Sequence, residues 1–256
     1  MQNAPIVFGN AMPKSGSHLI YQVLKGLDSL GPFVVPGFPP VTRSEANLNL
    51  EEDEVLANIQ ALGAGDIAYG YVHAREPFIS ALTQPDVATV FVYRDPRDVI
   101  VSHVFYATDM YDQHGMNTYY NEELEDMQQR IHAAIVGVDE PEHELSSIRT
   151  KYEKYMGWLE QPEVLSLRYE DLIQETENSL NRLLDHIESR GYVTPYLRGV
   201  AVEILREAIR PKASGTFRKG QPGEWKEHFS DANVAAFKEH TGDLLVGLGY
   251  EENSNW

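Results

Sequence analysis

Residues 6–27, IVFGNAMPKSGSHLIYQVLKGL, contain the pattern that decides how the chain is expected to fold. The segment Ile6–Gly9 is a short apolar run, typical of a buried strand. From Ser17 to Leu27, apolar residues recur at helical spacing and predict an amphipathic helix. The turn between them contains Lys14, and its backbone N–H groups lead into the start of the helix, where an anion can bind. The stretch therefore predicts a strand, an anion-binding loop and a helix.

The loop around Lys14 departs from the ATP-binding pattern GxxxxGK[ST]. Lys14 precedes Ser15, Gly16 and Ser17, so the match fails at the Gly-Lys order. On its sequence alone, an ordinary strand-to-helix turn explains the loop as well as an anion site does.

The same alternation of strand and helix continues along the chain. Further apolar runs predict strands at 67–72, 88–93 and 164–167. Helical periodicity predicts helices at 51–62, 96–107 and 122–135, and further helices around 180–187, 202–209 and 234–245. Strands that alternate with helices indicate an α/β fold, with a central, mainly parallel sheet flanked by helices and a P-loop-like binding loop.

Length and composition restrict the possible functions. The 256 residues are compatible with one domain over 1–256. A formal charge of −18 opposes binding to nucleic acid or to an anionic membrane. The N-terminus lacks a basic region before an apolar core, and no apolar run approaches the roughly 20 residues of a membrane span, so we expect a cytoplasmic protein. Cysteine is absent and the histidines lack a compact ligand spacing, so we expect no metal site.

A second motif, YRDPRDVIVS at 93–102, joins the end of a predicted strand to a predicted helix. Asp95 suits the N-cap of that helix and Pro96 its first position. The Arg94 guanidinium and the Ser102 hydroxyl are both good phosphate ligands and could converge on one phosphate. The alternative for Arg94 is a salt bridge to Asp95 or Asp98.

A third motif, FRKGQPGEWKEHF at 217–229, places Arg218 and Lys219 beside glycines in an irregular segment. Two cations on a flexible backbone suit a phosphate clamp. A basic pair on an ordinary protein surface is the alternative.

Together these motifs resemble the cytosolic-type sulfotransferases that use 3′-phosphoadenosine-5′-phosphosulfate (PAPS). The resemblance spans about residues 5 to 250 and rests on four motifs in the order of that family: PKSGSHL at 13–19, YRDPRDVIVSH at 93–103, LRYEDL at 167–172 and FRKGQPGEWKEHF at 217–229. It implies transfer of a sulfuryl group from PAPS to a small-molecule acceptor, with release of 3′,5′-phosphoadenosine phosphate (PAP) and without a metal.

The resemblance also implies which residues bind the donor. Those implied for the 5′-phosphosulfate are Lys14, Ser15, Gly16, Ser17 and His18, and those for the 3′-phosphate are Arg94, Ser102, Arg218, Lys219 and Gly220. Tyr169 matches a tyrosine that contacts the adenine. Leu19 lies where the family usually has an adenine-stacking tryptophan, so aromatic stacking is lost there.

Three residues are implied to be catalytic, namely His73, Lys14 and Ser102. His73 is the expected base, because a histidine with an ordinary pKa of about 6.5 can accept a proton near neutral pH. Glu76 is the reserve candidate. The family commonly has a lysine two residues before this histidine, but the chain has Tyr71 there, so Lys14 is expected to stabilise most of the developing charge.

The acceptor is less well specified. We expect its pocket to involve residues near Phe33 to Pro39, His73, Phe105 to Tyr111 and a lid at about 108–140. We expect the acceptor atom to be a hydroxyl oxygen or a nitrogen. The acidic surface favours a neutral or cationic molecule, and solubility is the alternative explanation for that surface. A P-loop kinase or ATPase and a catalytically silent nucleotide-binding protein are the alternative functions.

Overall fold

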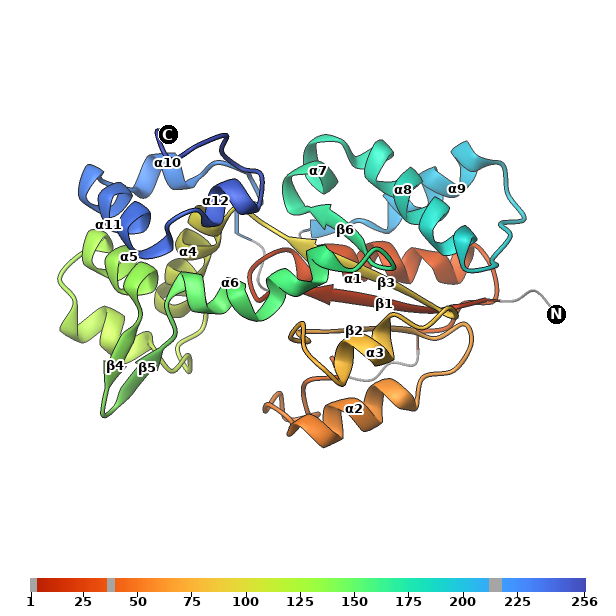
Figure 1. The fold of residues 1–256 in the computed structure, drawn as a ribbon, viewed down its shortest axis with the longest axis horizontal. Coiled ribbons are helices and arrows are strands. Elements are labelled where there is room, and N and C mark those ends of the chain that lie inside the picture. The colour runs from red at the N-terminus through yellow and green to blue at the C-terminus, as the bar shows by residue number, and fades with distance from the viewer. Residues whose placement is uncertain (1–3, 36–39, 212–217) are drawn as a thin grey trace. The chain divides into compact units, whose positions relative to one another are not determined.

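Four parallel strands form the main sheet of the described chain, in the order β2-β1-β3-β6. The structure is a computed structural model, and it describes residues 4–35, 40–211 and 218–256. The strands are β1 (Ile6–Ala11), β2 (Ile67–Gly70), β3 (Val87–Tyr93) and β6 (Leu165–Arg168) (Figure 1). The predicted central parallel sheet of an α/β fold is confirmed.

The two inner strands are apolar on both faces. Every residue of β3 except Tyr93 is buried, and β1 is buried from Val7 onward. Parallel strands covered on both faces are nearly continuous apolar runs, which is why the sequence identified them. In the register of the sheet, Asn10 of β1 lies opposite Gly70 of β2. The segments that follow β1 and β2 therefore leave the sheet at the same edge.

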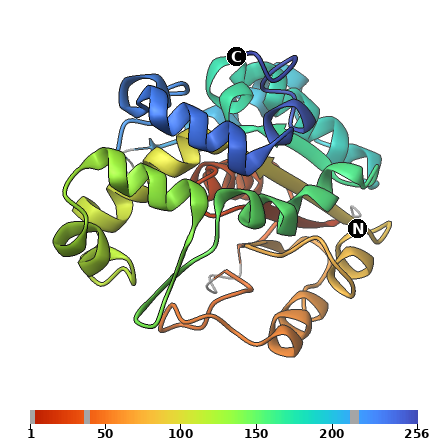
Figure 2. The ribbon, with the colours of Figure 1, turned by 60° about the vertical axis from the view of Figure 1, so that its left-hand side comes forward.

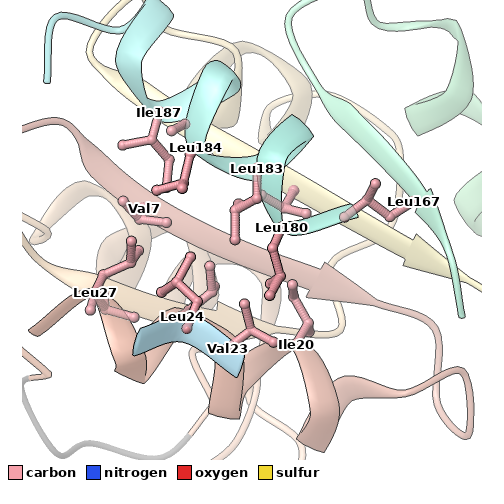
Figure 3. Packing of buried hydrophobic residues seen from close by; sticks show 14 of the residues in the cluster. Val7, Ile20, Val23, Leu24, Leu27, Leu167, Leu180, Leu183, Leu184 and Ile187 are labelled. Carbon is pink, nitrogen blue, oxygen red and sulfur yellow. The ribbon is translucent and has the colours of Figure 1, made fainter. Parts of the chain in front are cut away.

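An apolar cluster anchors three helices to one face of this sheet. They are α1 (Ser17–Lys25), α8 (Thr176–Ser189) and α9 (Arg198–Ala208). Figure 3 shows side chains of α1 and α8, among them Leu24 and Leu184, gathered with Val7 of β1. All three of these side chains are fully buried, so their burial contributes strongly to the stability of the fold. This packing holds α1 against β1.

The chain divides into two compact units. Unit 1 comprises Met1–Tyr93 and Tyr155–Phe217, and unit 2 comprises Arg94–Lys154 and Arg218–Trp256. Unit 1 also contains α2 (Glu52–Gln60), α3 (Phe78–Leu82) and α7 (Tyr169–Gln174). The described α-helices and strands of unit 2 are α4 (Pro96–Phe105), α5 (Met127–Val136), β4 (Val138–Glu140), β5 (His143–Leu145), α10 (Trp225–His228), α11 (Asp231–Thr241) and α12 (Leu244–Gly247). Two π-helices, η2 (Tyr106–Met110) and η3 (Tyr119–Glu123), also belong to it. Helix α6 (Ile148–Met156) contains the boundary that follows Lys154.

Within unit 2, α5 lies beside α11 (Figure 2), where Asn233 Nδ2 donates to Gln128 Oε1 at 2.7 Å. The predicted helix at 122–135 begins later than expected, at Met127. Asp126 caps the helix by accepting a hydrogen bond from the Gln129 N–H at 2.9 Å. The antiparallel hairpin of β4 and β5 was not expected.

None of the helices in the described ranges is both long and apolar enough to cross a lipid bilayer.

Candidate active site

The loop after β1 leads directly into the N-terminus of α1. Lys14 and Gly16 both have left-handed backbone conformations, with φ of 69° and 101°. Gly16 is the N-cap, no side chain caps the helix, and its first turn contains no acidic residue. The first N–H groups of a helix have no acceptor within the helix, and they lie at its positive end. The loop therefore has the chemistry of an anion site.

Ser15 adds a hydroxyl to this loop. Its side chain is fully buried, and Ser15 Oγ has no hydrogen-bond partner among the described residues. A buried hydroxyl without a partner is costly, by roughly 1–3 kcal/mol. An anion held by the loop would satisfy it. The donors of the loop thus fit a phosphosulfate.

Tyr169 packs against the loop. It is buried at the start of α7, and a Cβ added to Gly16 would lie 2.6 Å from Tyr169 Cδ2. Only glycine permits this close approach, and the φ of Gly16 favours glycine as well. The structure thus brings Tyr169, the predicted adenine contact, next to the loop. Leu19 instead lies in the apolar cluster of unit 1, with 9% of its surface exposed.

The segment that follows β2 carries Tyr71 and His73. Val72, between them, is held at both backbone groups by Asn10, which accepts from the Val72 N–H and donates to the Val72 carbonyl, each at 2.9 Å. Trp158 Nε1 donates to the same carbonyl at 2.8 Å. Through Asn10, the end of β1 and the segment after β2 are locked together.

His73 is partly exposed, and its ring meets the Tyr155 ring edge to face, with centroids 5.1 Å apart. This contact limits the orientations of the imidazole. The reserve base, Glu76, is exposed and accepts a hydrogen bond from the Ser80 N–H at 3.3 Å. His73 as the base stays a prediction.

In unit 2, Arg94 precedes α4 and its side chain is buried. Its Nη2 lies 3.7 Å from Asp98 Oδ2 and 3.5 Å from the Gln221 carbonyl oxygen. The salt bridge considered as an alternative for Arg94 is therefore present. Tyr152 Oη donates to the Arg94 carbonyl at 2.6 Å, which fixes its backbone. Asp95 caps α4 as predicted, accepting from the backbone N–H two residues on at 2.9 Å.

Asp98 connects α4 to the clamp segment, which we define as residues 218–229. Its carboxylate accepts from the Gly223 N–H at 2.7 Å and from the Trp225 N–H at 2.9 Å. Burial raises the pKa of Asp98, although Arg94 and these two N–H groups act against the shift. The sequence indicated Asp98 only as a salt-bridge partner of Arg94, and this connection to the clamp segment was not predicted.

Arg218 and Lys219 of the clamp segment share one carboxylate. Glu224 binds Arg218 through both guanidinium ends and lies 3.1 Å from Lys219 Nζ. The Arg218 guanidinium also lies 4.0 Å from the centre of the Phe105 ring. Ser102 is partly exposed on α4, and Gly220 has a φ of 67°. Phe217, the first residue of the third motif, lies outside the described residues.

Nearly the whole chain matches one protein family. The family model described as Sulfotransferase domain matches residues 7–249. The chain belongs to this family. The recognition made from the four motifs is therefore confirmed.

Curated relatives of the sulfotransferase domain include two that are named for their activities. The chain is 25% identical over 175 residues to 3-alpha-hydroxysteroid sulfotransferase of Cavia porcellus, in an alignment that covers 62% of this chain and 56% of the relative. It is 26% identical over 186 residues to flavonol 3-sulfotransferase of Flaveria bidentis, covering 62% and 55%. The matches thus span just over half the length of these relatives.

Solved sulfotransferase structures share the fold over nearly the whole chain. Mouse sulfotransferase SULT7A1 complexed with PAP superposes with a TM-score of 0.66 at 15% identity, covering 98% of this chain and 90% of that one. Retinol dehydratase in complex with androsterone and inactive cofactor PAP gives 0.61 at 14% identity, covering 94% and 80%. At these identities the likeness establishes the fold.

Within this sulfotransferase domain, the predicted site residues form two described groups. Unit 1 brings together the loop at 14–19, Tyr169 and the segment that carries His73. Unit 2 brings together Arg94 and the clamp segment, through Asp98 and Gln221. Sequence reasoning missed Asp98 and Glu224 as partners of these groups. Of the expected acceptor region, residues 36–39 lie outside the described residues, and Phe33 is buried.

Proposed function

We propose that this protein transfers a sulfuryl group from PAPS to a hydroxyl or nitrogen of a small molecule and releases PAP. The observation that carries the proposal is the loop before α1, where Ser15 Oγ is buried and has no hydrogen-bond partner among the described residues. This loop lies at an uncapped helix N-terminus, in a chain that belongs to the sulfotransferase domain family. We further propose that both units belong to one catalytic domain.

The donor ligands follow from the two groups of residues. We assign the 5′-phosphosulfate to Lys14 and the residues Ser15–His18, whose N–H groups, hydroxyls and ammonium suit an anion. The residues assigned to the 3′-phosphate are Arg94, Ser102, Arg218, Lys219 and Gly220. The adenine is assigned to Tyr169 and, by position, to Leu19.

The chemistry requires a base and a stabilised leaving oxygen. As the acceptor attacks sulfur, its proton moves to a ring nitrogen of His73 and a new bond to sulfur forms. The bond between sulfur and the bridging phosphate oxygen breaks, and its electron pair stays on the phosphate of PAP. Lys14 and the N–H groups of the loop stabilise the charge that develops on this oxygen. Ser102 is proposed to contribute to catalysis through its contact with the 3′-phosphate.

The acceptor is proposed to be a small molecule that is neutral or cationic. The formal charge of −18 supports this choice, and it disfavours nucleic acid as a partner. The relatives are named for steroid and flavonol sulfation, and both names denote small acceptors. A cytoplasmic location is likewise a proposal.

Nucleotide-dependent thermal shifts test the proposed donor. PAP should raise the melting temperature, and adenosine 5′-monophosphate, which lacks the 3′-phosphate, should raise it less. EDTA should not alter the PAP effect. Stabilisation by Mg²⁺ and ATP, without any effect of PAP, would instead identify a kinase or ATPase.

Turnover assays test the base and the alternative of a silent protein. We expect His73→Ala to abolish sulfuryl transfer while the PAP-dependent thermal shift is retained. Glu76→Ala is the matched variant and should keep most of the activity. Full activity in His73→Ala would move the role of base to another group, and PAP binding without turnover on any acceptor in a broad screen would favour the silent protein.

A further inference from the structure

The side chain of Tyr71 reaches the start of α1. Its hydroxyl lies 3.2 Å from Ser17 Oγ, within hydrogen-bond distance. Ser17 is the first residue of α1, and its side chain is buried in the loop. The phenol hydroxyl of Tyr71 is thus in contact with the anion loop, although the two residues are 54 positions apart in the sequence.

The backbone of Tyr71 is held firmly on both sides. Tyr155 Oη donates to the Tyr71 carbonyl at 3.3 Å, and the Tyr71 N–H donates to Thr42 Oγ1 at 3.3 Å. The next residue is fixed by Asn10 and by Trp158. A hydroxyl on such a support is preorganised, so it can donate to a charge in the loop with little reorganisation.

The loop has a single lysine, and a phenol hydroxyl adds a neutral donor to it. Either hydroxyl of the Tyr71–Ser17 pair can be the donor. If Tyr71 donates its proton to an anion, Ser17 Oγ can donate to the Tyr71 oxygen, and the contact between the two residues is kept. Tyr71 is only partly buried, so its hydroxyl is not sealed inside the core. These are the properties of a group that contacts a bound anion.

We propose that Tyr71 is a catalytic residue whose hydroxyl donates a hydrogen bond to the phosphate oxygen that gains charge as the bond to sulfur breaks. The inference rests on the proposed sulfuryl transfer. The hydroxyl keeps its proton throughout, and the proton of the acceptor still moves to His73. Tyr71 thereby supplies, without a positive charge, part of the stabilisation that Lys14 would otherwise provide alone.

PAPS and PAP differ in the charge of this oxygen. In PAPS the oxygen in question bridges phosphorus and sulfur and carries little charge, whereas in PAP it is a terminal phosphate oxygen. A hydrogen bond to it should therefore be stronger in PAP than in PAPS. An interaction that strengthens along the reaction lowers the barrier and so raises kcat.

Tyr71→Phe tests this by calorimetry and kinetics together. We expect PAP to bind about 10-fold more weakly, since a hydrogen bond to a charged group is lost. PAPS affinity, measured without acceptor, should change by less than about 3-fold, and kcat should fall by about 10- to 100-fold. The matched control is Tyr69→Phe, which removes a hydroxyl from the adjoining strand β2, where Tyr69 stacks on Tyr21. That control should change neither affinity nor kcat.

Two results would overturn the role of Tyr71. One is an unchanged kcat in Tyr71→Phe. The other is an equal weakening of PAP and PAPS together with a lower melting temperature, which would identify a purely structural contact with Ser17. Failure of the wild-type protein to bind PAP at all would instead reject the proposed function, so the two hypotheses are distinguished by the wild-type measurement.

Discussion

Arg218 and Glu224 form a two-point ion pair in the clamp segment. Arg218 Nη1 donates to Glu224 Oε1 at 2.6 Å, and Nη2 donates to the other carboxylate oxygen. The Glu224 side chain is only 5% exposed. Burial alone would raise the pKa of Glu224, but hydrogen bonds from Arg218 and Lys219 prevail and the pKa is lowered. A phosphate that binds these two cations must therefore compete with the Glu224 carboxylate.

Removing that competition should strengthen nucleotide binding. We expect Glu224→Gln to increase PAP affinity by roughly 3- to 10-fold, about 1 kcal/mol, because an amide does not compete as an anion. Titration calorimetry measures the effect. Adenosine 5′-monophosphate should show no gain, since it lacks the 3′-phosphate assigned to the clamp. Glu227→Gln is the control, because Glu227 is exposed and contacts only Lys219 of this pair, at 3.4 Å. An equal gain for both nucleotides would contradict the assignment.

Replacing Ser15 should separate stability from binding. Ser15→Ala removes a buried hydroxyl without a described partner, so it should stabilise the protein without nucleotide by about 1 kcal/mol, or about 2–4 °C. The same variant should reduce the stabilisation by PAP. Ser179 is the matched control, because its hydroxyl is equally buried and has no partner in the described part of the chain, but it lies on α8. Ser179→Ala should gain stability and keep the full PAP effect, and a loss of the PAP effect there would refute the argument.

Gly16 should tolerate no side chain. In Gly16→Ala the new methyl group would meet the Tyr169 ring at 2.6 Å, and the φ of 101° adds backbone strain. We expect loss of at least about 2 kcal/mol of stability and loss of the PAP-dependent thermal shift. Gly191→Ala separates the two causes, since Gly191 has a φ of 93° but no described atom within 4 Å of the position that its new methyl group would occupy. That control should lose less stability and bind PAP normally. Identical behaviour of the two variants would show that crowding by Tyr169 is unimportant.

His186 should make the fold sensitive to mild acid. Burial, reinforced by the charge of Arg190, lowers the pKa of His186 to about 4, although a backbone contact to Thr89 acts in the opposite direction. Between this value and the ordinary pKa of about 6.5, only the unfolded chain binds the proton, so stability decreases as the pH falls through this window. The slope is at most about 1.4 kcal/mol per pH unit. His186→Gln should flatten the melting temperature between pH 6.5 and 4. An unchanged slope would assign the sensitivity to other groups.

The inner strands of the sheet could be predicted because they are buried on both faces. The apolar run at 88–93 is typical of a strand buried in the middle of a parallel sheet. The observed strand β3 is longer than the predicted one by a single residue, Val87. Helix starts were harder to predict. The helix at Met127 follows several acidic residues that could each have capped it, and only the fold decides that Asp126 does so.

The partners within the site were less predictable than the site itself. The loop at Lys14 was identified from local sequence. The contact between Tyr71 and Ser17 depends instead on the pairing of β1 with β2, and Asp98 reaches Gly223 across 125 residues. Such long-range contacts have no periodic signal in the sequence. The competition from Glu224 was visible in principle, because it lies six residues after Arg218.

The buried hydroxyl of Ser15 also has a consequence for protein engineering. A library of variants ranked by heat resistance alone would enrich alanine at this position, because a buried hydroxyl without a partner among the described residues costs stability. The enriched clones would look improved and would have lost part of their nucleotide recognition. Screening in the presence of saturating PAP would reverse the ranking, so the choice of selection conditions would determine whether nucleotide binding or only heat resistance is retained.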